Sequence, residues 1–221
     1  MDGPKIIYKK NIHKFLKLSI IIVSYNVRSY LRKCLESIYQ SSIAQDIEII
    51  VVDNYSFDKT CDMITDEYPK VQLIRNQMNM GFSKAVNIGE FHAKGDYLCI
   101  LNPDTLVSEY TFNTLITYIE NSPHVGCIGP KVLNSDGTFQ LSCRRSFPHP
   151  MTAFFKFTGL SRIFPKSRLF GRYNLTYQDE NDIQKVDALS GSFMLMPREI
   201  FQIVGKFDES FFMYGEDLDY C

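Results

Sequence analysis

Leu18-Ser19-Ile20-Ile21-Ile22-Val23 is apolar at nearly every position and rich in β-branched residues. A strand covered on one face alternates apolar and polar residues, whereas a continuous apolar run indicates a strand buried on both faces. Ile47-Glu48-Ile49-Ile50-Val51-Val52 has the same character. Because doubly covered strands are typical of parallel sheets, these two runs predict the centre of one.

The surrounding segments extend this pattern. Residues 27–40 and 82–93 have helical periodicity, further strands are predicted at 71–75 and 97–101, and a short helix is expected between residues 58 and 68. Alternating strands and helices predict an α/β fold, with a mostly parallel, Rossmann-like sheet and helices on both faces.

The second half of the chain alternates less regularly. We expect an amphipathic helix over 108–121, a short strand over 125–130 and a hairpin turn at Asn134-Ser135-Asp136-Gly137. Residues 185–196 resemble a single strand, and Pro197 is expected to begin a short helix.

Composition excludes several classes of protein. The 221 residues suffice for one buried domain, and 24 basic against 25 acidic residues argue against nucleic-acid binding by bulk charge. Six cysteines without a Cys-x-x-Cys pair indicate reduced thiols in a cytoplasmic protein rather than disulfides or a zinc site. No apolar run approaches the ~20 residues of a membrane span, so any membrane contact is expected to be peripheral.

The charge is unevenly distributed along the chain. From Arg144 to Arg172 there are seven basic residues and no acidic one, together with several phenylalanines and prolines. We expect a partly helical, mobile excursion here. Two interpretations stay open: contact with an anionic lipid-diphosphate acceptor or an anionic membrane, or a solvated loop whose phenylalanines pack on the core.

Polar clusters follow three predicted strands: Ser24-Tyr25-Asn26, Asp53-Asn54 and Asn102-Pro103-Asp104. Parallel sheets bind ligands in the crevice beyond the carboxyl ends of their strands, so all three clusters should face one crevice. Asp104 could hold a divalent cation that bridges two phosphates, or it could cap the following helix. Asp53 could accept hydrogen bonds from a nucleobase or ribose, or it could act as a helix cap, for which Asp58 is better placed.

A glycine-containing loop precedes the helix at 82–93. In Asn79-Met80-Gly81-Phe82, Gly81 would allow the backbone to approach a ligand, and the helix N-terminus would suit an anionic group. The chain has no Gly-x-Gly-x-x-Gly, no P-loop and no Gly-x-Ser-x-Gly, which excludes dinucleotide-binding, P-loop and serine-hydrolase interpretations.

The end of the chain carries a pair of carboxylates within an aromatic segment. Phe211-Phe212-Met213-Tyr214-Gly215 leads into Glu216 and Asp217, which we expect on a loop. A half-buried carboxylate with raised proton affinity would suit general-base catalysis, whereas a solvated turn would make the pair incidental.

Taken in order, these motifs resemble family 2 glycosyltransferases over residues 18–221, and most closely the bacterial rhamnosyltransferase branch that builds surface polysaccharides. The resemblance implies a GT-A fold with a C-terminal acceptor-side subdomain. It also implies inverting transfer of rhamnose or another hexose from a nucleoside-diphosphate sugar to a lipid-linked or polysaccharide acceptor, at the cytosolic face of the membrane.

The resemblance also implies a function for individual residues. Asp53 would bind the nucleoside, Asp104 would bind Mg²⁺ or Mn²⁺ on the diphosphate, and Asp217, next to Glu216, would take the proton of the acceptor hydroxyl. The remaining candidates are Ser24, Tyr25, Asn26, Asn54, Gly81, Phe82, Asn87 and Asn102 on the donor side, and Gly191, Ser192 and Tyr214 on the acceptor side.

We expect a single domain over 1–221, with a donor half at 18–105 and an acceptor half at 106–221. Two departures from the family pattern stand out: Asn-Pro-Asp replaces Asp-x-Asp at the metal position, and the chain stops at Cys221. The latter predicts an incomplete acceptor half. The alternatives are a sugar-nucleotide pyrophosphorylase and a non-catalytic, truncated nucleotide-binding module.

Overall fold

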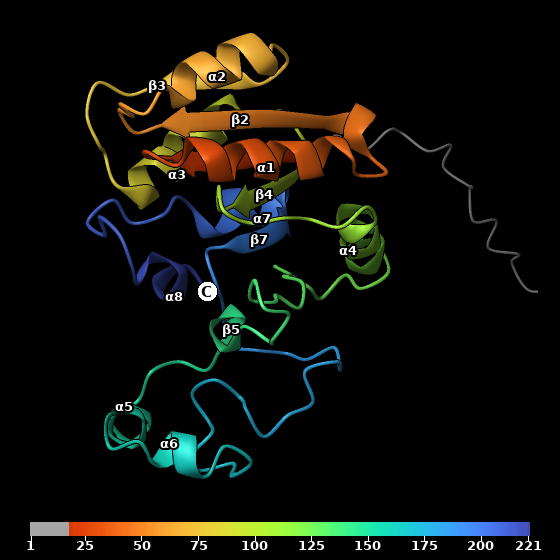
Figure 1. Cartoon of the computed structure of the whole chain (residues 1–221). Coiled ribbons are helices and arrows are strands. Elements are labelled where there is room, and N and C mark those ends of the chain that lie inside the picture. The colour runs from red at the N-terminus through yellow and green to blue at the C-terminus, as the bar shows by residue number, and fades with distance from the viewer. Residues whose placement is uncertain (1–17) are drawn as a thin grey trace, which may run out of the picture.

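The computed structural model describes residues 18–221 and has a five-stranded sheet at its centre (Figure 1). In spatial order the strands are β3 (Gln72–Arg75), β2 (Ile47–Asp53), β1 (Leu18–Ser24), β4 (Tyr97–Leu101) and β7 (Phe193–Pro197). The first four are parallel and β7 runs antiparallel to β4. The predicted α/β fold with a mostly parallel sheet is confirmed.

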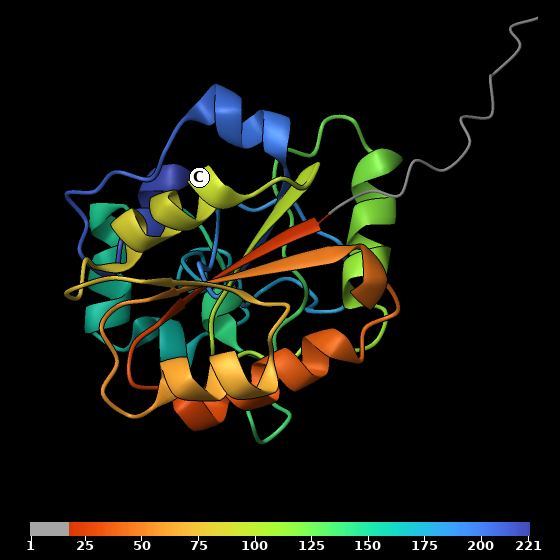
Figure 2. The same cartoon turned by 90° about the horizontal axis from the view of Figure 1, so that it is seen from above.

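Helices cover both faces of this sheet, as Figure 2 shows from above. One core joins the sheet to α1 (Arg28–Tyr39), α2 (Thr60–Glu67) and α4 (Thr111–Glu120). The other joins it to α3 (Phe82–His92) and α7 (Arg198–Val204). Burial on both faces explains why the central strands are apolar at nearly every position.

The pairing register brings the strand ends to one edge. Ser24 at the end of β1 lies opposite Asp53 at the end of β2, and Ile22 lies opposite Leu101 at the end of β4. The polar clusters that follow these strands therefore share this edge, as predicted.

Gly89 allows α3 to pack closely on the sheet, since a Cβ there would lie 2.5 Å from the Ile21 side chain.

Three expectations for the second half need correction. Residues 125–130 form no strand, only the isolated bridge between Ile128 and Leu195. Residues 185–196 are two strands, β6 (Ala188–Leu189) and β7, because Ser190-Gly191-Ser192 turns to contact other segments. Residues 216–220 form a short helix, α8 (Glu216–Tyr220), rather than a loop.

The helix α8 begins after Gly215, whose φ of +96° a residue with a side chain rarely adopts. The predicted turn at 134–137 is confirmed, with the Asn134 N–H donating to the Thr138 carbonyl at 2.8 Å. Two single-turn 3₁₀ helices complete the description, at Ala44–Asp46 and Leu141–Cys143.

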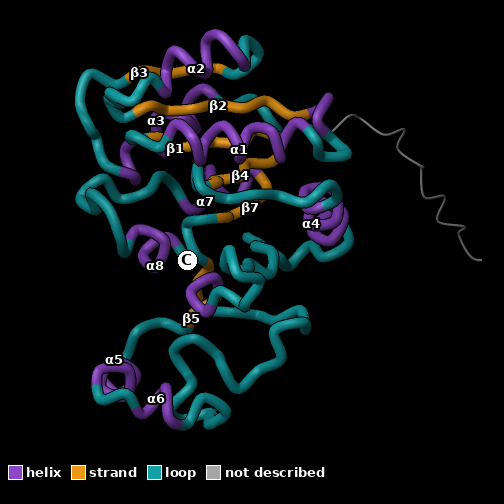
Figure 3. Tube along the Cα trace, viewed as in Figure 1, coloured by secondary structure: helices purple, strands orange, loops and turns teal. Residues whose placement is uncertain are grey.

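The basic stretch forms an excursion away from the sheet, with helices α5 (Pro150–Phe157) and α6 (Leu160–Ile163) joined by loops (Figure 3). Its base is the two-stranded pairing of β5 (Arg144–Arg145) with β6. Arg144 organises the returning loop because its guanidinium donates to four acceptors: the carbonyls of Leu175, Gln178 and Asp179, and Oε1 of Gln184.

All six cysteines lie within the described residues and are free. Within residues 18–221, no helix has the length and apolar character needed to cross a bilayer.

Candidate functional site

The ends of β1 and β2 are linked directly. The Asn54 N–H donates to the Ser24 carbonyl at 2.7 Å. The Ser24 hydroxyl is fully buried and has no partner among residues 18–221. Asp53 is also buried, and its carboxylate accepts hydrogen bonds from the backbone N–H (2.9 Å) and hydroxyl (2.6 Å) of Ser56. Asp53 therefore closes the turn after β2 and does not cap α2.

Asp58 lies just before α2, but the N-cap position is occupied by Lys59, which makes no side-chain cap hydrogen bond. One of the Asp58 oxygens accepts from the Thr60 N–H at 3.1 Å, and the other accepts from the Arg28 N–H at 2.8 Å. Burial opposes ionisation of Asp58, but hydrogen bonds from Thr60 and Arg28 outweigh it and lower its pKa. One carboxylate thus holds the N-terminal ends of α1 and α2 together, a link that sequence analysis missed.

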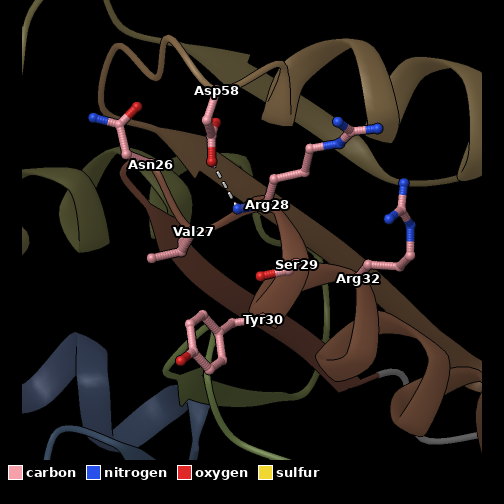
Figure 4. Close-up of a pocket in the computed structure, with 7 residues that line it drawn as sticks. All are labelled: Asn26, Val27, Arg28, Ser29, Tyr30, Arg32 and Asp58. Carbon is pink, nitrogen blue, oxygen red and sulfur yellow. Dashed lines mark hydrogen bonds between the residues drawn. The ribbon is translucent and has the colours of Figure 1, made fainter.

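Beside these helix ends lies a hollow of about 300 Å³ (Figure 4). It is lined by Asn26, Val27, Arg28, Ser29, Tyr30, Arg32 and Asp58. Arg32 is paired with Glu67 at 2.6 Å, whereas Nε of Arg28 is buried without a partner among the described residues. Asn26 was predicted from the sequence, whereas Arg28 was not, although it lies just after the Ser24-Tyr25-Asn26 cluster.

Asp104, which follows β4, is exposed, and no hydrogen bond or ion pair from residues 18–221 engages its carboxylate. The helix α4 begins only at Thr111, so Asp104 does not cap it. The described residues contain no group of three metal-ligating side chains. A single free carboxylate fits a Mg²⁺ or Mn²⁺ ion that takes its other ligands from substrate phosphates and water.

The glycine loop differs from our expectation. The closest approach to Gly81 is made by the chain itself, since a Cβ there would lie 2.6 Å from the Phe212 carbonyl oxygen. The Phe82 N–H, at the start of α3, donates to that same oxygen at 2.7 Å. The Asn54 amide holds this loop by donating to the Gly81 carbonyl at 3.0 Å. Gly81 and Phe82 therefore contact residue 212, and the first N–H of α3 is already paired within the protein.

Asn87, another donor-site candidate, is bonded within the fold. Its amide nitrogen donates to the Phe207 carbonyl at 2.9 Å and to Glu209, and its oxygen accepts from the Phe207 N–H at 3.0 Å. These bonds use the whole side-chain amide to anchor the segment that leads to α8.

The predicted base, Asp217, is buried against two donors. The Gly191 N–H donates to its Oδ2 at 2.9 Å, and Arg145 forms an ion pair with the same oxygen. Arg145 also donates to the Leu189 carbonyl at 2.9 Å. The other oxygen, Oδ1, accepts no hydrogen bond from residues 18–221. From the sequence, Arg145 was assigned only to the basic stretch, because pairing across the fold leaves no local signal.

Glu216 is the carboxylate with raised proton affinity. It is buried, its Oε2 has no partner among the described residues, and burial together with the neighbouring Asp217 charge raises its pKa. Tyr214, just before it, is 83% exposed and has a φ of +70°. Such a backbone conformation is strained for a tyrosine, and strained residues of this kind cluster at functional sites.

The donor-side and acceptor-side candidates meet around Ser192. The Asn102 N–H donates to the Ser192 carbonyl at 3.0 Å, and the preceding Gly191 contacts Asp217. Figure 1 shows α8 on the side of the sheet toward which β2 points. Asp217 is thus held beside the segment that carries Asp104, and its side chain is only 12% exposed.

Comparisons with known proteins agree with this architecture. The chain is 27% identical over 213 residues to an N-acetylglucosaminyl-diphospho-decaprenol L-rhamnosyltransferase of Mycobacterium tuberculosis, covering 91% of this chain and 68% of that protein. It is 28% identical over 208 residues to the low-salt glycan biosynthesis hexosyltransferase Agl10 of Haloferax volcanii, covering 92% of this chain and 60% of that protein.

Two solved structures share the fold. The mannosyltransferase PcManGT from Pyrobaculum calidifontis, in complex with GDP-Man and Mn²⁺, superposes with a TM-score of 0.63 at 17% identity, covering 93% of this chain and 50% of that one. TarS of S. aureus gives a TM-score of 0.63 at 19% identity, covering 93% of this chain and 32% of that one. The expected GT-A fold is confirmed.

The chain therefore spans between about a third and two thirds of the length of these proteins. The model of the family "Glycosyl transferase family 2" matches residues 19–204, which is most of the chain. This match shows that the chain belongs to glycosyl transferase family 2.

Proposed function

We propose that this chain catalyses inverting transfer of rhamnose or another hexose from a nucleoside-diphosphate sugar to a lipid-linked or polysaccharide acceptor in cell-surface glycan synthesis. Family membership and the names of the two relatives support this class of reaction. The observation that carries it is the position of Asp217, a buried carboxylate held beside the polar ends of parallel strands.

In this proposal the nucleoside lies near Asp53 and Tyr25, next to the hollow lined by Asn26 and Arg28. Tyr25 is 45% exposed, so its ring is accessible for stacking with the nucleobase of the donor. Asp104 would hold Mg²⁺ or Mn²⁺, which would neutralise negative charge on the leaving group. A structural neighbour solved with GDP-Man and Mn²⁺ is consistent with such a donor and ion.

The acceptor hydroxyl attacks the anomeric carbon of the donor sugar from the face opposite the diphosphate. Its oxygen forms the new glycosidic bond, the bond to the diphosphate oxygen breaks, and the electron pair leaves with the diphosphate. The hydroxyl proton passes to Asp217, whose Oδ1 is free to receive it while Arg145 and Gly191 hold Oδ2. In this proposal Ser192 and Tyr214 contact the acceptor.

The test combines binding and turnover. Thermal unfolding of the full chain is followed with UDP-, dTDP- and GDP-sugars, with and without Mn²⁺, and the stabilising donor is then assayed for transfer to lipid-linked and glycan acceptors. We expect one donor to stabilise the protein more with Mn²⁺ and to be consumed only with an acceptor. Tight donor binding without transfer would favour a non-catalytic module, and synthesis of a nucleotide sugar from a nucleoside triphosphate would favour a pyrophosphorylase.

A further inference from the structure

The outer helix of the excursion has an exposed apolar stripe. Thr152 and Phe155 of α5 are buried, whereas Met151, Phe154 and Phe157 are 59%, 55% and 93% exposed. Their spacing of three residues places them along one side of the helix. Phenylalanine at such exposure is unfavourable in water, so this side of α5 is suited to a partner that removes it from water.

The apolar surface continues beyond α5. Ile163, Phe164 and Leu169 are 65%, 50% and 57% exposed. Of the phenylalanines here, Phe155 and Phe170 do pack together, with ring centroids 4.9 Å apart. The interpretation that this stretch is a solvated loop with its aromatic rings turned inward therefore holds for only part of it.

Cations surround these apolar residues in the sequence. Lys156, Arg162, Lys166, Arg168 and Arg172 are all exposed, and no acidic residue occurs between residues 137 and 178. None of the five forms an ion pair within residues 18–221. Lys166 and Arg168, with Tyr177 and Gln178, line a hollow of about 410 Å³ whose chemistry suits a phosphate group.

We propose that the excursion docks on an anionic lipid bilayer, with the apolar side chains of α5 and α6 entering the interface and the five cations meeting lipid phosphates. Basic segments with exposed aromatic and aliphatic residues bind such interfaces through buried apolar area plus electrostatic attraction. A second copy of the chain is a poorer occupant, because it would bring two positively charged surfaces together.

The placement agrees with a lipid-linked acceptor, and in this respect the inference rests on the proposed function. Figure 1 shows α8, which carries Asp217, between the sheet and the α5–α6 pair, and Figure 2 also places α8 and α5 on the same side. Arg145, the partner of Asp217, lies in β5 at the base of the excursion. A bilayer beneath α5 and α6 would thus face the acceptor side of the site.

The experiment measures co-sedimentation of the full chain with vesicles of phosphatidylcholine alone or mixed in equal parts with phosphatidylglycerol, without substrates. We expect binding to the mixed vesicles only. Phe157→Ser should lower the partition coefficient about tenfold. Lys166→Glu and Arg168→Glu should each lower it by about fivefold or more.

Matched controls come from exposed residues on the other helices. Phe91 of α3 is 76% exposed and Lys33 of α1 is exposed, so Phe91→Ser and Lys33→Glu remove the same groups elsewhere. Both should bind vesicles as the wild type does. The lysines at positions 5, 9, 10, 14 and 17 are present in every variant, so differences between variants report on the excursion.

The inference is overturned if the wild type does not co-sediment with anionic vesicles, or if Phe157→Ser and Phe91→Ser bind them equally. It is also overturned if Phe157→Ser abolishes a concentration-dependent dimer while leaving vesicle binding intact, since a second copy would then be the occupant. Transfer to a soluble acceptor is assayed separately. Lost vesicle binding with intact transfer contradicts only this inference, and intact vesicle binding without transfer contradicts only the proposed function.

Discussion

Arg145 and Asp217 are 72 positions apart in the chain, yet their side chains form an ion pair in which both are largely buried, with exposures of 14% and 12%. The pair joins the base of the basic excursion to α8. It also orients the Asp217 carboxylate, because Arg145 and the Gly191 N–H hold one oxygen and leave the other without a partner among the described residues.

The first prediction concerns this pair. Arg145→Met leaves the Asp217 charge buried and unpaired, so we expect it to lower the free energy of unfolding by about 3–5 kcal/mol, measured by urea denaturation. Adding Asp217→Asn should recover part of the loss. The exposed pair between Arg32 and Glu67 is the control, and Arg32→Met should change stability little. Equal effects of the two arginine variants would contradict the prediction.

The second prediction concerns the base. Asp217→Asn keeps the shape of the side chain but removes its capacity to accept a proton, so transfer should fall ~10²–10⁴-fold. Donor affinity, measured by calorimetry, should be retained. Asp219→Asn is the control, since Asp219 is an exposed carboxylate on the same helix. Wild-type activity of the Asp217 variant would remove this residue from the reaction.

The third prediction concerns the ion. Asp104→Asn should remove the gain in donor affinity that Mn²⁺ gives the wild type, because the ion would lose its only protein carboxylate in this proposal. Calorimetric titrations of the donor with and without Mn²⁺ measure the effect, which we expect to be about tenfold or more. Asp96, an exposed acid at the opposite end of β4, provides the control Asp96→Asn. An unchanged response to Mn²⁺ in the Asp104 variant would place the ion elsewhere.

The fourth prediction concerns the contact between Gly81 and Phe212. Gly81 has a φ of +81°, which is strained for alanine, and the Cβ of Gly81→Ala would lie 2.6 Å from the Phe212 carbonyl oxygen. We therefore expect the substitution to lower the free energy of unfolding by about 2–5 kcal/mol. Gly137→Ala also has a positive φ, but its Cβ would meet open space. Thermal unfolding should therefore show a clearly smaller loss for Gly137→Ala. Similar losses would mean that the contact with Phe212 is not close in solution.

The fifth prediction concerns Glu216 and pH. Burial and the charge of Asp217 raise its pKa above the ordinary 4.5, so the folded protein binds this proton more readily than the unfolded chain does. The stabilisation that comes from binding this proton is present below pH 4.5 and is lost as the pH rises through the raised pKa of Glu216 in the folded protein. Glu216→Gln should thus be more stable than the wild type at neutral pH but not below pH 4.5. Unfolding free energies measured across this range test it, and a difference that does not change with pH would contradict it.

The first half of the fold was accessible to sequence analysis because its information is local. Each run such as 18–23 or 47–52 carries its own strand signal, and parallel strands with helical connections leave few alternative topologies. The second half was less accessible. Residues 185–196 are apolar enough for one strand, but contacts of Gly191 with Asp217 and of Ser192 with Asn102 divide the segment.

The candidate site shows the same division. Asp53, Asp104 and Asp217 could be named from the sequence because acids after buried strands and within aromatic segments are locally conspicuous. Gly81 was assigned to the donor side because a glycine lets the backbone approach a ligand, and Asn87 because of the family resemblance, yet the structure joins them to Phe212 and Phe207.

The sequence by itself determined the alternation of strands and helices, the polar strand ends and their common edge, since these follow from residue periodicity and from the geometry of parallel sheets. Only the tertiary structure decided that Arg145 pairs with Asp217, that residue 212 contacts the start of α3, and that α5 turns its phenylalanines outward. Such contacts join residues far apart in the chain, and which of many chemically suitable partners meet depends on how the whole chain packs.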